Sequence, residues 1–206
     1  MLPRMPPSRR TVALVVPVAG FLLGFGDFVW IKWVPFPFAE LGNSTATWAV
    51  AAFALGWWIR SGAVRAAVAA SVLLIVAVPS YYLAATLLQD DDLAVIWSPT
   101  SIVWMAFGVV AGVVFGVAGI WARAEGWRRV VGTALPVAVF VEEALRFALK
   151  SRSGYPGAWW NVAIDLALAA LLVVLVGRSA RVRLLAAAVA LPLAAAGAVT
   201  FAAVAG

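Results

Sequence analysis

The sequence has no cysteine and no histidine among its 206 residues. Their absence excludes disulfides, thiolate nucleophiles, haem ligation by histidine and the usual zinc and copper sites. Charged residues are also scarce, at 12% of the chain, whereas soluble domains carry about 25%. Any chemistry must therefore use carboxylates, arginine, hydroxyls, amides or aromatic rings, and we expect neither a metal nor a cofactor.

Apolar residues make up 65% of the chain, too many for the surface of a soluble domain. The pattern predicts an all-α fold, a polytopic transmembrane bundle that forms a single integral membrane domain over residues 1–206. The first apolar run follows MLPRMPPSRR without a cleavage site, so we expect a retained span rather than a signal peptide. The seven predicted spans are 11–31, 44–59, 66–88, 101–122, 130–149, 159–177 and 184–205.

Basic residues alternate between the predicted loops, which indicates an orientation. With the N-terminus in the cytoplasm and the C-terminus outside, eleven basic residues lie inside and four outside. This asymmetry explains the net charge of +6 without nucleic acid as a partner. We expect a multi-pass protein of a bacterial cytoplasmic membrane. The inner residues are Arg4, Arg9, Arg10, Arg60, Arg65, Arg123, Arg128, Arg129, Arg178, Arg181 and Arg183, and the outer ones are Lys32, Arg146, Lys150 and Arg152.

Two local patterns concern packing. Gly108, Gly112 and Gly116 are spaced four apart within one predicted span, so a neighbouring helix can approach closely along them. This stripe predicts either a seam inside the monomer or a homodimer interface. The segment PFPFAELG resists helix formation through its prolines. We expect it to dip into the membrane surface as a candidate lid before Asn43 or Ser44 caps the second span.

Four carboxylates fall within predicted spans: Asp27, Glu142, Glu143 and Asp165. Acids at membrane depth generally face a bundle interior or a wet cavity and have functional roles. Arg146 follows the two glutamates within one helical turn and can reach either one. Because consecutive residues point about 100° apart, we expect that both glutamates cannot face the same partner.

Aromatic residues gather at the predicted outer level of the bundle, together with these acids. An interfacial belt accounts for many of the tryptophans, but the aromatic residues at this level are more numerous than a belt requires. We therefore expect the acidic and aromatic residues to share one outward cavity. The candidate substrate-binding residues are Trp30, Trp48, Tyr81, Trp104, Phe140, Arg146, Trp160 and Asn161, of which Asn161 shares a helix face with Asp165.

Acids beside aromatic rings favour one kind of chemistry. Apolar walls disfavour the charged form of a carboxyl group, which can then serve as a proton donor. Aromatic faces stabilise cations that lie within about 6 Å. Such a cavity suits protonation of an alkene or epoxide followed by carbocation cyclisation, with a second carboxylate taking the terminating proton.

The segment VFVEEALRFAL at 139–149, together with the seven-span plan, resembles the small integral membrane terpenoid cyclases. These include the heterodimer-type lycopene cyclases, whose Pro-x-Glu-Glu element is matched by Glu142, Glu143 and Phe147, although Phe140 stands at the proline position. The resemblance implies a lipophilic isoprenoid substrate within the membrane lipid. It also implies acid catalysis by Glu142 or Glu143 with Asp165 or Asp27. The chain further resembles uncharacterised actinobacterial integral membrane proteins of similar length, which imply no activity.

The same residues are also compatible with two other functions. An outward acidic and aromatic pocket suits a solute-binding or transport component, with a cationic or aromatic solute held through cation–π contacts and the first loop as its lid. The acids could instead only pair with arginine and backbone in a structural membrane protein. The sequence alone leaves these two and the acid-initiated cyclase as alternatives.

Overall fold

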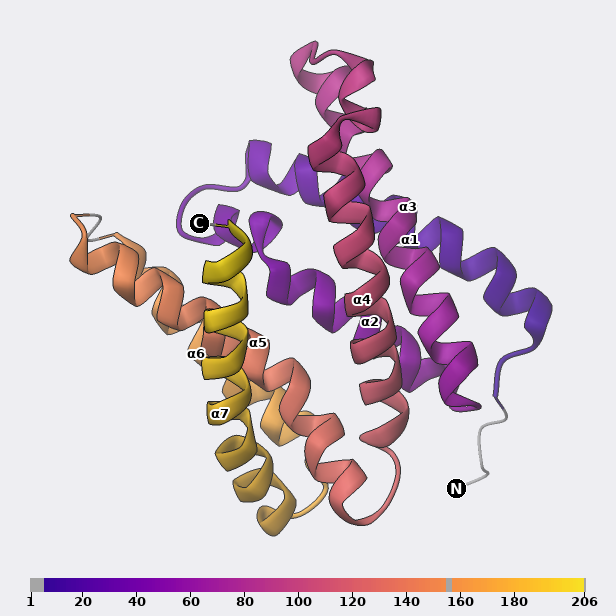
Figure 1. Cartoon of the computed structure of the whole chain (residues 1–206), viewed down its shortest axis with the longest axis vertical. Coiled ribbons are helices and arrows are strands. Elements are labelled where there is room, and N and C mark those ends of the chain that lie inside the picture. The colour runs from indigo at the N-terminus through magenta and orange to yellow at the C-terminus, as the bar shows by residue number, and fades with distance from the viewer. Residues whose placement is uncertain (1–5, 155–156, 206) are drawn as a thin grey trace.

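The computed structural model describes residues 6–154 and 157–205, with side chains described as far as residue 200. All regular structure within these residues is helical (Figure 1). The elements are α1 (Arg9–Trp33), η1 (Phe38–Asn43), α2 (Thr45–Ile59), α3 (Ala63–Gln89), η2 (Leu93–Trp97), α4 (Pro99–Trp121), α5 (Gly126–Arg152), α6 (Ala158–Val176) and α7 (Ala180–Ala205), where η denotes a short 3-10 helix.

The prediction of an all-α membrane bundle is confirmed at this level. Each of the seven α-helices overlaps one of the apolar runs. Among the described residues, five helices are long and apolar enough to cross a membrane, namely α1, α3, α4, α6 and α7. The chain is therefore a multi-pass membrane protein by the length and composition of its helices.

The other two helices differ for separate reasons. α2 is apolar but has 15 residues, so it is about 22 Å long at 1.5 Å per residue, less than the hydrocarbon core of a bilayer. α5 is long enough at 27 residues but carries Arg128 and Arg129 near its start and Glu142, Glu143 and Arg146 further along. Both glutamates are buried against other helices, as expected of charged groups at membrane depth.

The helices form two groups, which are joined by α2 and by packing of α4 against α5. In one group α3 packs against α1 and α4, and in the other α5 packs against α6 and α7. α2 contacts α4 and α3 on one side and α5 on the other, and Figure 1 shows it between the two groups. Its first turn is therefore available to side chains from both groups.

The glycine stripe of α4 is a seam within the chain. A Cβ atom on Gly116 would lie 2.6 Å from the carbonyl oxygen of Ala66, and one on Gly108 would lie 3.2 Å from Leu74 Cβ. A Cβ on Gly112 would collide with the backbone of Ser71. Since α3 covers all three glycines, this face is not available as the homodimer surface that we considered from the sequence, and close approach of the two backbones explains the spacing.

The first loop folds onto α1 through η1. Trp30 Nε1 donates a hydrogen bond of 2.8 Å to the carbonyl oxygen of Phe38. A Cβ on Gly42 would lie 2.9 Å from the carbonyl oxygen of Asp27, so this glycine allows η1 to lie directly on α1. Ser44 then caps α2, as predicted, with its Oγ accepting the N–H of Thr47 at 3.1 Å.

Candidate functional site

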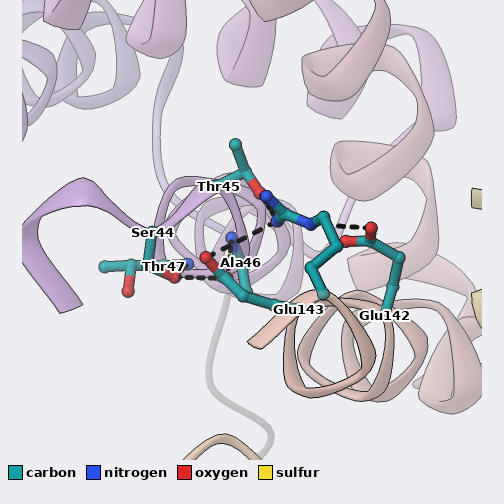
Figure 2. Close-up of polar contacts among 7 residues, drawn as sticks. Ser44, Thr45, Ala46, Thr47, Glu142 and Glu143 are labelled. Atoms are coloured by element: carbon teal, nitrogen blue, oxygen red, sulfur yellow. Dashed lines mark hydrogen bonds and ion pairs between the residues drawn. The ribbon is translucent and has the colours of Figure 1, made fainter. Parts of the chain in front are cut away.

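The first turn of α2 receives the side chain of Glu143 from α5 (Figure 2). Ser44 Oγ donates a hydrogen bond of 2.7 Å to Glu143 Oε2, and the N–H of Ala46 donates one of 3.1 Å to the same oxygen. A helix N-terminus offers unpaired N–H groups and the positive end of the helix dipole, both of which favour a carboxylate. Glu143 therefore fastens α5 to α2 while remaining a buried acid.

Arg146 lies between the two glutamates. Its Nε is 2.7 Å from Glu142 Oε1 and its Nη2 is 3.6 Å from Glu143 Oε1. The same Nη2 donates a hydrogen bond of 3.1 Å to Thr45 Oγ1. Our expectation that both glutamates cannot face one partner is wrong, because the guanidinium group carries donors on separate edges and can serve two carboxylates.

Asp165 approaches this ion-pair group from α6. It is 2% exposed, and Glu143, Arg146 and Glu142 all act on it electrostatically. None of the described residues donates a hydrogen bond to its Oδ2. On the same helix, Asn161 Nδ2 donates a hydrogen bond of 3.0 Å to the carbonyl oxygen of Pro37.

We call Glu142, Glu143, Asp165 and Arg146 the acid group. α7 encloses it from a further side, because a Cβ on Gly197 would lie 3.5 Å from Glu142 Cγ. Two carboxyl groups of α5 thus form ion pairs with one arginine, and the buried Asp165 of α6 lies within electrostatic reach of all three. The structure brings together three of the four acids that we predicted.

Asp27, the fourth acid, is held by a different contact. Trp48 Nε1 of α2 donates a hydrogen bond of 2.8 Å to Asp27 Oδ2 of α1. Asp27 is 8% exposed, and its charge acts on the nearby Tyr81, whose ring meets Phe28 edge to face at 5.2 Å. This pair links α1 to α2, as Glu143 links α5 to α2.

The aromatic residues do not surround the acid group, contrary to our expectation of one shared cavity. Trp30, Trp104 and Trp160 are 43%, 41% and 65% exposed. Phe140 is buried in an apolar cluster of α5, α6 and α7. Amphipathic rings at the outer surface of a membrane bundle suit the interface between lipid and water, which accounts for their exposure. Of the predicted aromatic residues, Trp48 contacts Asp27 and Tyr81 lies near it, away from the acid group.

A polar hollow of about 160 Å³ lies between η1 and α5. Its lining residues are Glu40, Asn43, Glu143, Arg146, Phe147 and Lys150. The predicted lid segment therefore forms one wall, and the acid group reaches the hollow through Glu143 and Arg146. Another hollow, of about 230 Å³, is almost entirely apolar and lies between α1, α3 and η2.

Sequence reasoning missed Glu40 and Lys150 as lining residues. On α5, residues 143, 146, 147 and 150 follow the spacing of one helix face, so Lys150 could have been found from the position of Glu143. No comparable period marks Glu40, which reaches the hollow only because η1 folds back onto α1.

The arrangement can exchange protons and can bind groups of either charge. Among the described residues, no cluster of three or more acids has the spacing to hold a metal ion. The acid group instead combines its three carboxyl groups with a guanidinium group. Such a site can hold a polar solute or pass a proton between carboxyl groups.

Comparison with known proteins identifies a family. Residues 4–206 match the model of a family described as a family of unknown function, DUF6518. Neither the curated proteins nor the solved structures give a match. Since the match covers nearly the whole chain, this protein belongs to the DUF6518 family.

Proposed function

We propose that this protein is a solute-binding component of a membrane transport system, with its solute in the hollow between η1 and α5. The observation that carries the proposal is the meeting of Glu143 and Arg146 at the wall of that hollow, with Asp165 buried behind them. Ionisable groups inside a membrane bundle commonly mark paths of substrates, ions or protons.

The size and lining of the hollow favour a small zwitterion, such as an amino acid. Glu40 and Glu143 offer negative charge, while Arg146 and Lys150 offer positive charge. Asn43 adds an amide and Phe147 an apolar surface. Drug-sized sites are about 300–1,000 Å³, so a hollow of about 160 Å³ fits a much smaller solute.

Proton exchange at the acid group would couple to this binding. Glu143 reaches the hollow, and Asp165 interacts electrostatically with Glu143 while its Oδ2 receives no hydrogen bond from the described residues. A proton that binds to Glu143 from the hollow could therefore move on to the carboxyl group of Asp165. A change in the charge of Glu143 would also loosen its contacts with Ser44 and Ala46, which join α5 to α2.

The acid-initiated terpenoid cyclase has less support. Its chemistry needs an apolar cavity lined by aromatic rings, in order to fold an isoprenoid and stabilise carbocations. The hollow beside Glu143 is polar, and Trp104 and Trp160 face outward. The buried acids that a cyclase needs are present, but the hollow beside them lacks an apolar, aromatic lining.

We also propose seven crossings, with the N-terminus inside a bacterial cytoplasmic membrane and the C-terminus outside. Contacts between the helix ends support this arrangement. Arg65 at the start of α3 donates hydrogen bonds to the carbonyl oxygens of Pro7 and Ser8 just before α1. At the other ends of the same helices, Lys32 Nζ donates to the carbonyl oxygen of Leu88. The arginines at the starts of α1 and α3 therefore lie on the same side, which supports an orientation that follows the positive-inside rule.

Thermal unfolding of the purified full chain, in the presence of individual amino acids, tests the binding proposal. We expect at least one amino acid to raise the unfolding temperature of the wild type at neutral pH. Asp165→Asn should change the pH dependence of this response, and Glu143→Gln should weaken it. Asp91→Asn is the control, because Asp91 is exposed and lies far along the chain from the acid group.

Other results would overturn the proposal. If no amino acid stabilises the protein, or if Glu143→Gln responds as the wild type does, the hollow is not the binding site. Incubation with linear isoprenoids and their epoxides gives the competing test. Cyclic products that disappear in Glu142→Gln and Glu143→Gln would favour the cyclase instead.

A further inference from the structure

Asn161 and Asp165 are buried polar side chains of α6 inside the bundle. Asn161 is 3% exposed and Asp165 is 2% exposed. None of the described residues donates a hydrogen bond to Asn161 Oδ1 or to Asp165 Oδ2. Because buried polar atoms in folded proteins nearly always have a partner, these two oxygens require an explanation.

The two side chains are neighbours on one face of α6. Residues four apart on a helix have Cβ atoms about 5–6 Å apart. Side chains of a helix also lean toward its N-terminus, so that of Asp165 leans toward Asn161. The amide nitrogen of Asn161 is already used, since Nδ2 donates a hydrogen bond of 3.0 Å to the carbonyl oxygen of Pro37. A carbonyl oxygen can only accept, so Pro37 fixes the orientation of this amide and leaves Asn161 Oδ1 for Asp165.

A proton on Asp165 supplies the missing donor. A protonated carboxyl group carries one O–H, and its hydrogen bond to Asn161 Oδ1 would satisfy both oxygens at once. A metal ion suits the place less well, because hard cations take about six oxygen ligands. Within the part of the chain that the structure describes, no cluster of three or more acids could hold such an ion.

The charges around Asp165 also favour its neutral form. Arg146 forms ion pairs with both glutamates of the acid group, so its positive charge is shared before it acts on Asp165. A third carboxylate would add negative charge inside the bundle, which is costly. The charged groups on the elements beside α6 are Glu142, Glu143 and Arg146 of α5, Glu40 of η1, and Arg181 and Arg183 at the start of α7.

We propose that Asp165 and Asn161 form a proton-binding site that holds η1 in place through Pro37. In the protonated form, Asp165 Oδ2 donates to Asn161 Oδ1 while Asn161 Nδ2 donates to Pro37. Pro37 directly precedes η1, which forms one wall of the solute hollow. The inference deepens the proposed function by naming its proton site, and it requires no bound solute.

Loss of the proton changes what Asn161 must do. The proton passes to the carboxylate of Glu143 and from there to water in the hollow, and Asp165 becomes a carboxylate that can only accept hydrogen bonds. The NH2 group of Asn161 then turns toward Asp165 and leaves the carbonyl oxygen of Pro37. Asn161 is thus a positioning residue, through which the charge of Asp165 acts on η1.

Infrared spectroscopy of the full chain in lipid nanodiscs tests for the proton without any solute. A protonated carboxyl group has a C=O stretching band that an ionised one lacks. We expect this band in the wild type at neutral pH, its loss in Asp165→Asn, and its shift to higher wavenumber in Asn161→Leu, which lacks the acceptor. The controls are the exposed Asp91→Asn and Thr133→Val, which removes another buried oxygen without a partner among the described residues.

A spin label on η1 tests the link to the hollow. The chain has no cysteine, so Phe38→Cys at an exposed position gives one attachment site. Asn161→Leu should make the label mobile at every pH, because it cannot bond to Pro37. Asp165→Asn should keep the label immobile at every pH, because its amide can always donate to Asn161 Oδ1. In the otherwise unchanged chain, the label should become mobile as the pH rises and the band disappears.

The results separate the proton site from the proposed solute. Absence of the band from the wild type overturns the proposal, and so does its full persistence in Asp165→Asn. Equal mobility of the label in Asn161→Leu and Asp165→Asn would show that Asn161 has only a structural role. Failure of every amino acid to stabilise the protein would overturn the solute proposal alone, because neither the band nor the label depends on a solute.

Discussion

Glu143 is the residue on which the acid group depends most directly. It is 3% exposed and accepts hydrogen bonds from Ser44 and Ala46 at the start of α2. It also lies 3.6 Å from the guanidinium group of Arg146. A buried carboxylate is stable only with such partners, so the charge of Glu143 and its structural role depend on the same contacts. A substitution that removes the charge but keeps the shape of the side chain distinguishes the two.

Glu143→Gln keeps the shape of the side chain but removes its negative charge. We expect the free energy of unfolding to fall by about 1–2 kcal/mol, since a charge-assisted bond at a helix N-terminus becomes a neutral one. Urea unfolding in detergent micelles, followed by circular dichroism, measures the change. The exposed Asp91→Asn should stay within about 0.5 kcal/mol of the wild type. An unchanged Glu143→Gln would mean that Glu143 is not ionised in its contact with α2.

At the scale of elements, α4 is held between α3 and α2 by glycines. Gly112 leaves no room for a Cβ beside Ser71, and Gly116 lies against Ala66 and against Gly56 of α2. Dispersion contacts between backbones replace the hydrophobic effect that joins helices in water. The seam is therefore sensitive to the addition of a single methyl group.

Two glycine substitutions should change the stability of the protein in opposite directions. Gly112→Ala forces α4 away from α3, and we expect a loss of about 1–3 kcal/mol of stability. Gly26→Ala in α1 meets no atom within 4 Å, so it should gain about 0.5–1 kcal/mol from helix propensity. Unfolding midpoints of the two variants against the wild type give the comparison. If Gly112→Ala is as stable as Gly26→Ala, the seam between α3 and α4 is not as close as described.

For the whole molecule, the contacts between helix ends divide the chain into two sides. Arg65 joins the starts of α1 and α3, while Lys32 joins their other ends. The acid group and its hollow lie near the start of α2. In the proposed orientation, a solute from outside would reach the hollow at the start of this short helix.

The absence of cysteine allows a direct test of this sidedness. Ser153→Cys and Ser179→Cys each place one thiol at an exposed position beyond opposite ends of the helices. In intact spheroplasts, a membrane-impermeant maleimide should label Ser153→Cys and should label Ser179→Cys only after lysis. The reverse order would show that the N-terminus lies outside, and labelling of both before lysis would contradict seven crossings.

The positions of the helices and their membrane surroundings could be predicted from the sequence. Apolar runs of bilayer length dictate helices, because backbone groups in lipid must bond within their own segment. The same constraint makes acids within apolar runs easy to recognise in the sequence, and three of the four that we named lie close enough to interact electrostatically. A cap of α2 at Asn43 or Ser44 was predicted from residue type, and the structure shows that it is Ser44. The reach of Arg146 to a glutamate was predicted from their spacing on one helix.

The contacts between side chains of different helices could not be predicted from the sequence. Rotation of each helix about its axis is set by packing, so the sequence could not tell that Trp104 and Trp160 face outward or that Asp27 pairs with Trp48. It also could not place Glu40 beside Lys150, because the fold of η1 onto α1 brings together residues far apart in the chain. Hydropathy indicates whether a segment is surrounded by membrane or protein. The direction in which a side chain points, and the residue that it contacts, depend on how the helices pack in three dimensions.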